Sequence, residues 1–190
     1  VEPGHGVRPL DGPQEWFHGN GAVRERQVYS GGVKHGPWEL FHENGQLRSK
    51  GNFEQGKRHG PFEVFYPSGQ PRSRGTHRDD RRDGSYESYH ENGRLESRGS
   101  FVAGKKAGLW EQFYDNGQLK QKGSYRDDLA SGPFEQFHEN GQLTIRENYR
   151  DGKRDGPYES YDENGRLKTR GTFKAGALDG RAACMPAFGA

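Results

Sequence analysis

One position of the sequence is filled repeatedly by histidine, which raises the question of a metal site. If each copy belongs to its own β-hairpin, adjacent copies lie two strands apart, roughly 9–10 Å. Zinc binds nitrogens at about 2.1 Å and usually takes four ligands, so such a column coordinates it poorly. We predict no metal site and an amphipathic surface position that accepts either ring. Its occupants are His18, His42, Tyr66, His90, Tyr114, His138 and Asp162.

A column of glutamates suggests carboxylate chemistry of the kind that glycosidases use. Each glutamate is followed eleven residues later by a lysine or arginine, which favours cross-strand ion pairs instead. A catalytic acid needs an environment of its own that shifts its pKa, and a repeat gives every copy the same one. No G-x-S-x-G, Walker or H-E-x-x-H motif is present. We predict that the chain is not an enzyme, with no catalytic residues and no cofactor. The glutamates are Glu15, Glu39, Glu63, Glu87, Glu111, Glu135 and Glu159.

These columns exist because the chain repeats itself every 24 residues. A glycine marks the step at 12, 36, 60, 84, 108, 132, 156 and 180, without insertion or deletion. Seven complete units therefore occupy residues 11–178. Residues 1–10 form an N-terminal tail, and residues 179–190 form a partial eighth repeat that ends in a C-terminal cap or tail. The chain is one repeat array and not two domains.

Composition alone would indicate disorder, because Leu, Ile, Val and Phe make up only about 15% of the residues. Two observations oppose that interpretation. The net charge is only +2, so the chain does not repel itself. Of the 23 aromatic residues, 19 occupy three positions of the repeat, which indicates shared buried or ligand-facing positions.

Each unit reads as a β-hairpin. In the second unit, residues 38–42 form an aromatic strand, Asn44-Gly45 gives a hairpin turn, and residues 47–53 form the returning strand. We predict a two-residue type I′ turn, which places Glu39 directly opposite Lys50. The alternative is a three-residue loop with a bulge, which would shift that pairing and bring Phe41 to the face of Leu47 and Phe53.

A single hairpin is marginal in water, so the hairpins must support one another. Pairing edge to edge gives an all-β fold, a solenoid-like elongated antiparallel sheet of seven tandem 24-residue β-hairpins. Its open edges make end-to-end self-association plausible.

The units resemble MORN repeats. The segment DGPYESYDENGRLKTRGTFKAG, residues 155–176, is similar to the bacterial variant with G-P-aromatic-E-x-aromatic, then N-G-x-L, then G-x-aromatic, as in YwqK-like antitoxins. The resemblance implies a β-hairpin solenoid with a scaffold or binding role and no catalytic activity. Local departures affect the first, third and sixth units: Gln14 replaces an aromatic residue, Pro71 a leucine, His77 an aromatic residue and Glu147 a glycine.

Two surfaces are candidates for binding. An aromatic column forms either the thin core or a partner-binding surface; its members are Trp38, Phe62, Tyr86, Trp110, Phe134 and Tyr158. A basic stripe would attract anionic lipid, unless the glutamates of the same face neutralise it; its members are Arg48, Lys50, Arg72, Arg74, Arg98, Lys120, Lys122, Arg146 and Arg170.

We therefore expect a non-enzymatic scaffold for protein–protein interaction, in one version an antitoxin or immunity-like protein. The alternatives are attachment to an anionic phospholipid membrane surface and, less favoured, glycan or choline binding by aromatic cages. No nucleic acid partner is expected. The chain has no apolar run long enough to span a membrane, and it begins at Val1, so both a cytoplasmic and an exported protein without its leader are compatible. The single cysteine, Cys184, excludes a disulfide within the chain.

Overall fold

The 24-residue repeat folds into an antiparallel β-hairpin, and in the second repeat Glu39 lies opposite Lys50. The computed structural model describes residues 11–180 and 183–184, and among these it contains strands and turns but no helix. Each further pairing of consecutive strands is also antiparallel, for example β2 with β3 and β11 with β12. The prediction of an all-β chain of tandem antiparallel hairpins is confirmed.

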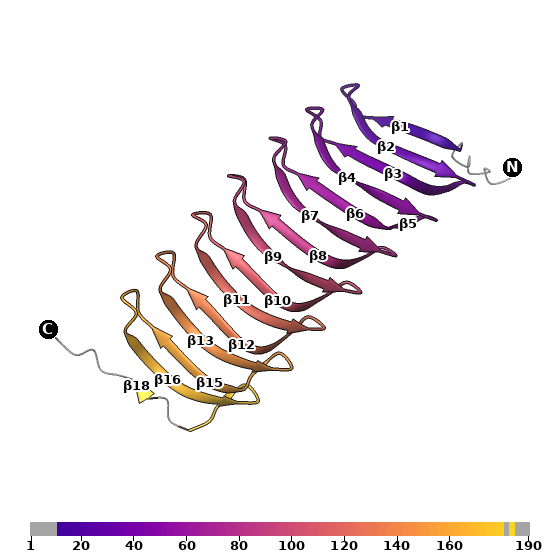
Figure 1. Cartoon of the computed structure of the whole chain (residues 1–190). Helices are drawn as coiled ribbons and strands as arrows, with labels where there is room; N and C mark the ends of the chain where they lie inside the picture. The colour runs from indigo at the N-terminus through magenta and orange to yellow at the C-terminus, as the bar shows by residue number, and fades with distance from the viewer. Residues whose placement is uncertain (1–10, 181–182, 185–190) are drawn as a thin grey trace, which may run out of the picture. The chain divides into compact units, whose positions relative to one another are not determined.

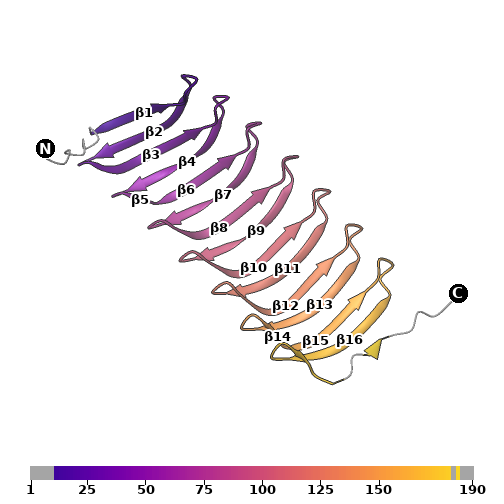
Figure 2. The same ribbon diagram turned by 180° about the vertical axis from the view of Figure 1, so that it is seen from behind.

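The chain divides into two compact parts, one ending at Asp83 and one beginning at Gly84. We call these two parts units from here on, and each 24-residue repeat a hairpin. Within each unit, consecutive strands lie side by side (Figure 1, and from behind in Figure 2). The first unit contains β1 (Gly12–Phe17), β2 (Val23–Ser30), β3 (Val33–Phe41), β4 (Leu47–Glu54), β5 (Lys57–Arg58), β6 (Gly60–Phe65), β7 (Pro71–Arg78) and the start of β8 (Arg81–Tyr89). The second contains the rest of β8, then β9 (Leu95–Val102), β10 (Lys105–Phe113), β11 (Leu119–Arg126), β12 (Leu129–Phe137), β13 (Leu143–Arg150), β14 (Lys153–Arg154), β15 (Gly156–Tyr161), β16 (Leu167–Lys174), β17 (Ala177–Leu178) and β18 (Ala183–Cys184).

The two predicted tails fall largely outside the described residues. Residues 1–10 lie outside them entirely, as do 181–182 and 185–190 of the expected cap or tail. The short β18 pairs with β16, where Thr169 lies opposite Cys184. The backbone of β16 therefore has partners on both sides, β15 on one and the chain that follows it on the other.

The Asn-Gly turn is not the predicted two-residue type I′ turn. The His42 N–H donates to the Gln46 carbonyl (2.9 Å) and the Gly45 N–H donates to the His42 carbonyl (2.9 Å), so residues 43–45 form a three-residue loop. Positive φ falls on Gly45 (80°) and not on Asn44. This is a type I turn followed by a left-handed residue, a common geometry for three-residue hairpin loops.

A bulge after the turn restores the pairing that the longer loop would have shifted. Phe41 lies opposite Leu47, but Leu40 lies opposite Ser49, which leaves Arg48 as the extra residue of β4. The ion-pair register was therefore predicted correctly from the wrong turn. Phe41 shares a face with Leu47, as the alternative interpretation required, but Phe53 lies on the opposite face, where its ring contacts Trp38.

The turn asparagine is selected for its hydrogen bonds and not for positive φ. Asn116 Oδ1 accepts from the Gln118 N–H (2.8 Å), and its Nδ2 donates to the Glu139 carbonyl of the next hairpin (3.1 Å). The same two bonds are made by Asn20, Asn44, Asn92 and Asn140. One side chain thus closes its own turn and also holds the neighbouring turn.

The type I′ turns lie at the opposite end of the strands, where one hairpin continues into the next. Gln55 and Gly56 have φ of 48° and 82°, and Asp79 and Asp80 have 49° and 67°. Positive φ at both central residues defines this turn type, whose twist matches that of the flanking strands. These turns also bind the preceding repeat, because the Gly56 N–H donates to the Lys34 carbonyl of β3 (2.8 Å).

Alternation along the strands gives each unit two different faces. One face carries aromatic rings that touch within and between hairpins. Phe134 lies with its ring centroid 5.0 Å from that of Tyr149 in its own hairpin and 5.4 Å from that of Tyr125 in the preceding one. We call this the aromatic face. The other carries the glutamates and their basic partners, such as Glu135 and Arg146, and we call it the ion-pair face.

The thin apolar core lies on the aromatic face. Phe62, Phe101, Trp110 and Phe134 are the buried apolar side chains of the described residues, each exposing 8% or less. Burying a side chain of this size contributes about 1.5–3 kcal/mol. Since a single layer of strands has no second layer to cover it, these rings are covered mainly by their neighbours on the same face.

Glycine lies beneath these rings because a side chain would collide with them. A Cβ at Gly123 would lie 2.3 Å from the ring of Phe134, and one at Gly99 would lie 2.3 Å from the ring of Trp110. Neither glycine has positive φ, so the requirement is space and not backbone conformation.

In the sixth hairpin this glycine position holds a buried carboxylate. Glu147 exposes only 1% of its surface. It accepts a hydrogen bond from the Tyr149 hydroxyl (2.8 Å) and lies 2.8 Å from Arg154 Nε. Phe134 extends over Gly123 of the preceding hairpin, which is consistent with room for a side chain at position 147.

We expect Gly123→Ala to lower the free energy of unfolding by about 1–3 kcal/mol, because the added methyl group overpacks against Phe134. Alanine in place of a glycine that has ordinary φ would otherwise be neutral or stabilising, so the sign is diagnostic. Urea unfolding measures it. Ser124→Ala, one residue along on the opposite face, is the control. An unchanged or raised stability of Gly123→Ala would contradict the steric argument.

We expect Asn116→Ala to cost about 1–2 kcal/mol, because it removes two hydrogen bonds of roughly 0.5–1.5 kcal/mol each. Asn116→Asp keeps the acceptor for its own turn and loses the donor to the next, so its loss should be intermediate. Thermal unfolding of the two variants compares them. Equal losses would show that the bond between hairpins contributes nothing.

We expect Arg154→Met to destabilise the chain by about 3 kcal/mol, because it leaves a buried carboxylate without its cation. The double variant Glu147→Gly/Arg154→Met restores the glycine of the other hairpins and should recover most of that loss. Lys106→Met, at the equivalent position of another hairpin, is the control. Chemical denaturation in which the double variant is no more stable than the single one would refute the pairing.

Candidate functional site

On the ion-pair face, Arg26 and Arg146 each lie between a glutamate of their own hairpin and one of the next. Arg146 Nε is 3.1 Å from Glu135, and its other nitrogen is 3.7 Å from Glu159. Lys122 lies 2.8 Å from Glu135, and this hydrogen bond lowers the pKa of the glutamate. Because the cations are about half exposed, each pair contributes little to stability. Their positive charge is nevertheless offset locally.

The structure separates the nine residues of the predicted basic stripe into two groups. Six lie on the ion-pair face, each directly opposite a glutamate of its hairpin: Lys50, Arg74, Arg98, Lys122, Arg146 and Arg170. The other three occupy the bulge position after the turn. Of these, Arg48 and Arg72 line a hollow on the aromatic face, and Lys120 lies 5.4 Å from the ring centroid of Tyr114. The nine residues therefore do not form one continuous stripe.

A second basic column, which sequence reasoning missed, lies on the aromatic face. Lys106 Nζ is 4.5 Å from the ring centroid of Trp110 and 5.0 Å from that of Tyr125. Arg154 lies 5.3 Å from the ring of Phe173. Cations at such distances are attracted by the ring faces. The column consists of Lys34, Arg58, Arg82, Lys106 and Arg154, with Ala130 and Leu178 in the two remaining copies. Its 24-residue spacing was the signal that could have revealed it.

The members of the predicted aromatic column differ in exposure. Phe62, Trp110 and Phe134 are buried, whereas Trp38, Tyr86 and Tyr158 are half-buried. All six lie on the aromatic face, and cations overlie several of them, including Phe62, Trp110 and Tyr158. A ligand on this face would therefore meet basic side chains together with ring edges.

In the first unit, a hollow of about 490 Å³ opens on the aromatic face. We call it the arginine groove, because its lining contains four arginines and no aspartate or glutamate. Burial, and then the nearby charges of Arg58 and Arg82, lower the pKa of His77 below its usual value, so this histidine is neutral at neutral pH. The lining residues are Trp38, Leu40, His42, Arg48, Ser49, Arg58, Phe62, Val64, Phe65, Tyr66, Pro67, Arg72, His77 and Arg82.

Two of these arginines lie against aromatic rings of the groove. The Arg72 guanidinium is 5.7 Å from the ring centroid of Tyr66, and that of Arg82 is 6.0 Å from Phe62. Arg48 and Arg58 are exposed. An arginine on a ring keeps its N–H donors available at the edge of the guanidinium plane, so the groove offers a set of donors above an apolar floor.

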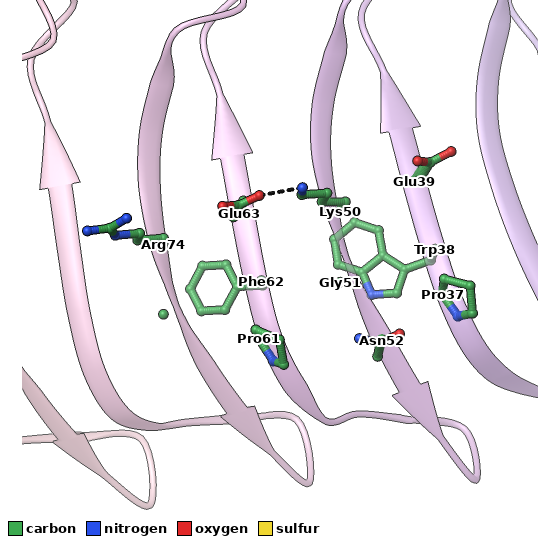
Figure 3. A pocket seen from close by; sticks show the side chains of 11 residues that line it. Pro37, Trp38, Glu39, Lys50, Gly51, Asn52, Pro61, Phe62, Glu63 and Arg74 are labelled. Carbon is green, nitrogen blue, oxygen red and sulfur yellow. Dashed lines mark ion pairs between the residues drawn. The ribbon is translucent and has the colours of Figure 1, made fainter.

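A second hollow of about 420 Å³ lies between β3, β4, β6 and β7. Figure 3 shows the Trp38 ring extending from β3 over Gly51, the Phe62 ring extending from β6 toward β7, and the ion pair of Lys50 with Glu63. Trp38 Nε1 is buried and has no hydrogen-bond acceptor. Most of the lining of this hollow belongs to the ion-pair face, and it shares Trp38 and Phe62 with the arginine groove.

The histidine column connects neighbouring hairpins. The ring nitrogen of His90 lies 3.0 Å from the Phe113 carbonyl, and the Tyr114 hydroxyl donates to the Phe137 carbonyl (2.8 Å). Histidine and tyrosine are interchangeable here because either polar tip reaches the same carbonyl. No group of three or more potential metal ligands is found within the described part of the chain.

In the described part of the chain, no helix has the length and apolar character needed to cross a bilayer.

Comparison with known proteins places the chain in a family. No curated protein matches the chain. The family described as MORN repeat variant matches residues 34–55, 58–79, 82–103, 106–127, 131–151 and 154–175.

Each matched segment corresponds to one hairpin of the structure, running from one connecting turn to the next. The first hairpin lies outside the matched segments; it carries Gln14 and Gln27 where other hairpins have the ring and the glycine. The six matches together cover more than half of the sequence. The chain therefore belongs to the MORN repeat variant family.

Proposed function

We propose that the chain is a non-enzymatic scaffold that binds another protein along the aromatic face, in the manner of an antitoxin or immunity protein that occludes its partner. MORN repeats are commonly binding or scaffold modules, which supports the general role. The antitoxin version rests on the resemblance of the hairpins to the bacterial variant.

The observation that carries the proposal is the cation column on the aromatic face. Lys34, Lys106 and Arg154 recur at one position of the repeat, and each lies within about 5 Å of a ring centroid. Arginine and aromatic residues are enriched where proteins bind one another. Repetition of the same pair along a unit suits an elongated or multivalent partner.

The ion-pair face is a poorer candidate. Its cations have glutamate partners, for example Arg26 with Glu15 at 2.8 Å and Lys122 with Glu135 at 2.8 Å. In the cation column Lys34 and Arg154 also lie near glutamates, whereas Lys106 lies over the rings of Trp110 and Tyr125. Attachment to an anionic membrane, suggested by the predicted basic stripe, would have to compete with the pairs of the ion-pair face. Recognition of glycan or choline would require more exposed rings than the half-buried Trp38 and Tyr158 offer.

We expect Lys106→Glu to abolish capture of a partner protein from a lysate of the source cell, because it reverses a charge of the cation column that lies over the rings of Trp110 and Tyr125. The folded chain serves as bait, and mass spectrometry identifies what is retained in stoichiometric amounts. Lys174→Glu is the matched control, since it makes the same charge change at an exposed position of the opposite face.

Thermal unfolding of both variants must show that they remain folded. A protein retained by the wild type and by Lys174→Glu, but not by Lys106→Glu, supports the proposal. Equal retention of the partner by the wild type and both variants would show that the partner does not bind at the aromatic face. An eluate without a specific protein, combined with salt-dependent binding to anionic liposomes, would favour the membrane alternative.

A further inference from the structure

We propose that the arginine groove binds an acidic, proline-rich segment of the partner protein in the polyproline II conformation, with a carboxylate at every third residue. The inference rests on the proposed function and names the chemistry of the partner that the groove fits. It is carried by the charge, the spacing and the floor of the groove.

The charge of the groove favours an anionic ligand. Arg48, Arg58 and Arg72 line it beside the ring-bound Arg82, and the lining includes no aspartate or glutamate. Asp80 accepts a hydrogen bond from the Arg58 backbone N–H (3.0 Å) but is not part of the lining. This contrasts with the ion-pair face, where basic side chains alternate with glutamates at 2.6–3.7 Å. Both faces are built from the same repeats, so the excess of positive charge is a property of this hollow and not of the chain, whose net charge is only +2.

The arginines of the groove are suited to bind carboxylates, and their restricted side chains define where those carboxylates must lie. A guanidinium presents its donors as a planar fork that matches a carboxylate with two parallel hydrogen bonds. Contact with the rings of Tyr66 and Phe62 restricts Arg72 and Arg82. Restricted side chains lose less conformational entropy when they bind, so the groove is partly organised before its ligand arrives.

The spacing of the arginines selects the conformation of the ligand. Arg48 and Arg72 occupy equivalent positions of successive hairpins, as do Arg58 and Arg82. Equivalent positions lie two strands apart, about 9.6 Å. A polyproline II segment advances about 3.1 Å per residue and turns once in three residues, so every third side chain points the same way about 9.3 Å further on. In an extended strand, side chains of one face recur at about 6.6–6.8 Å, which does not match.

The floor of the groove also favours such a segment. This floor contains Trp38, Leu40, Phe62 and Val64, and aromatic-lined grooves are the usual docking sites of proline-rich segments.

The test uses two labelled dodecapeptides of identical composition and fluorescence anisotropy with the purified full chain. In one, the sequence Glu-Pro-Pro is repeated four times; in the other, four glutamates precede eight prolines. We expect the periodic peptide to bind at least tenfold more tightly than the block peptide. Its affinity should fall at least tenfold in Arg48→Gln/Arg72→Gln. It should stay within twofold of wild type in Arg78→Gln/Lys174→Gln, which loses the same charge at exposed positions outside the groove.

Absence of binding by the periodic peptide, equal binding of the two peptides, or equal loss in both double variants would overturn the inference. Displacement of the periodic peptide by vesicles of phosphatidylserine and phosphatidylcholine, but not by the phosphatidylcholine vesicles alone, would assign the groove to a membrane surface instead. These failures are distinguishable from failure of the proposed function. A partner captured through Lys106 while the peptides do not bind would leave the scaffold in place and remove only the acidic segment.

Discussion

The close contact between an aromatic ring and a backbone without a side chain is the constraint on which the fold depends. A single layer of strands has no opposing layer, so its rings can be buried only by lying flat against the strands themselves. The ring of Phe134 covers Gly123, and that of Trp110 covers Gly99. Where the glycine is replaced, as at Glu147, the buried carboxylate must be given a cation and a hydroxyl. The repeated glycine is therefore as much a core residue as the ring that lies over it.

Polar side chains then connect one hairpin to the next. The turn asparagines and the side chains of the histidine column both reach a backbone carbonyl 23 residues further along the chain. Asn92 does so with Asp115, and His90 with Phe113. The ion-pair face adds bridges such as Lys122 to Glu135. Each bond is modest by itself. Because neighbouring hairpins within a unit are joined by several of them in the same direction, stability accumulates between neighbours and not within an isolated hairpin.

The period, the strands and the opposition of Glu39 and Lys50 could all be predicted from the sequence, because they depend on spacing alone. The turn type could not. Asn-Gly suits a type I′ turn by backbone preference, and only the carbonyl of the next hairpin shows why the asparagine is there. The arginine groove was missed for a similar reason: Arg58 and Arg82 lie beside a bulge, where alternation no longer tells which face a side chain occupies. The ion pairs between hairpins, such as Lys122 with Glu135, were also not predicted, because spacing within one repeat does not show which glutamate of the neighbouring repeat lies within reach.

The bonds between neighbouring hairpins have a consequence for how the chain can change in length. Since the contacts join equivalent positions of adjacent repeats, deletion or duplication of a whole 24-residue hairpin leaves each surviving turn with a similar neighbour. Insertions of other lengths would instead place an asparagine opposite the wrong carbonyl. The buried pair of Glu147 with Arg154 is an exception, because it has no counterpart in the other hairpins. Most repeats can thus replace one another, and the repeat that carries this pair cannot. Recombination between repeats could therefore add hairpins to the chain while each hairpin keeps the same contacts with its neighbours.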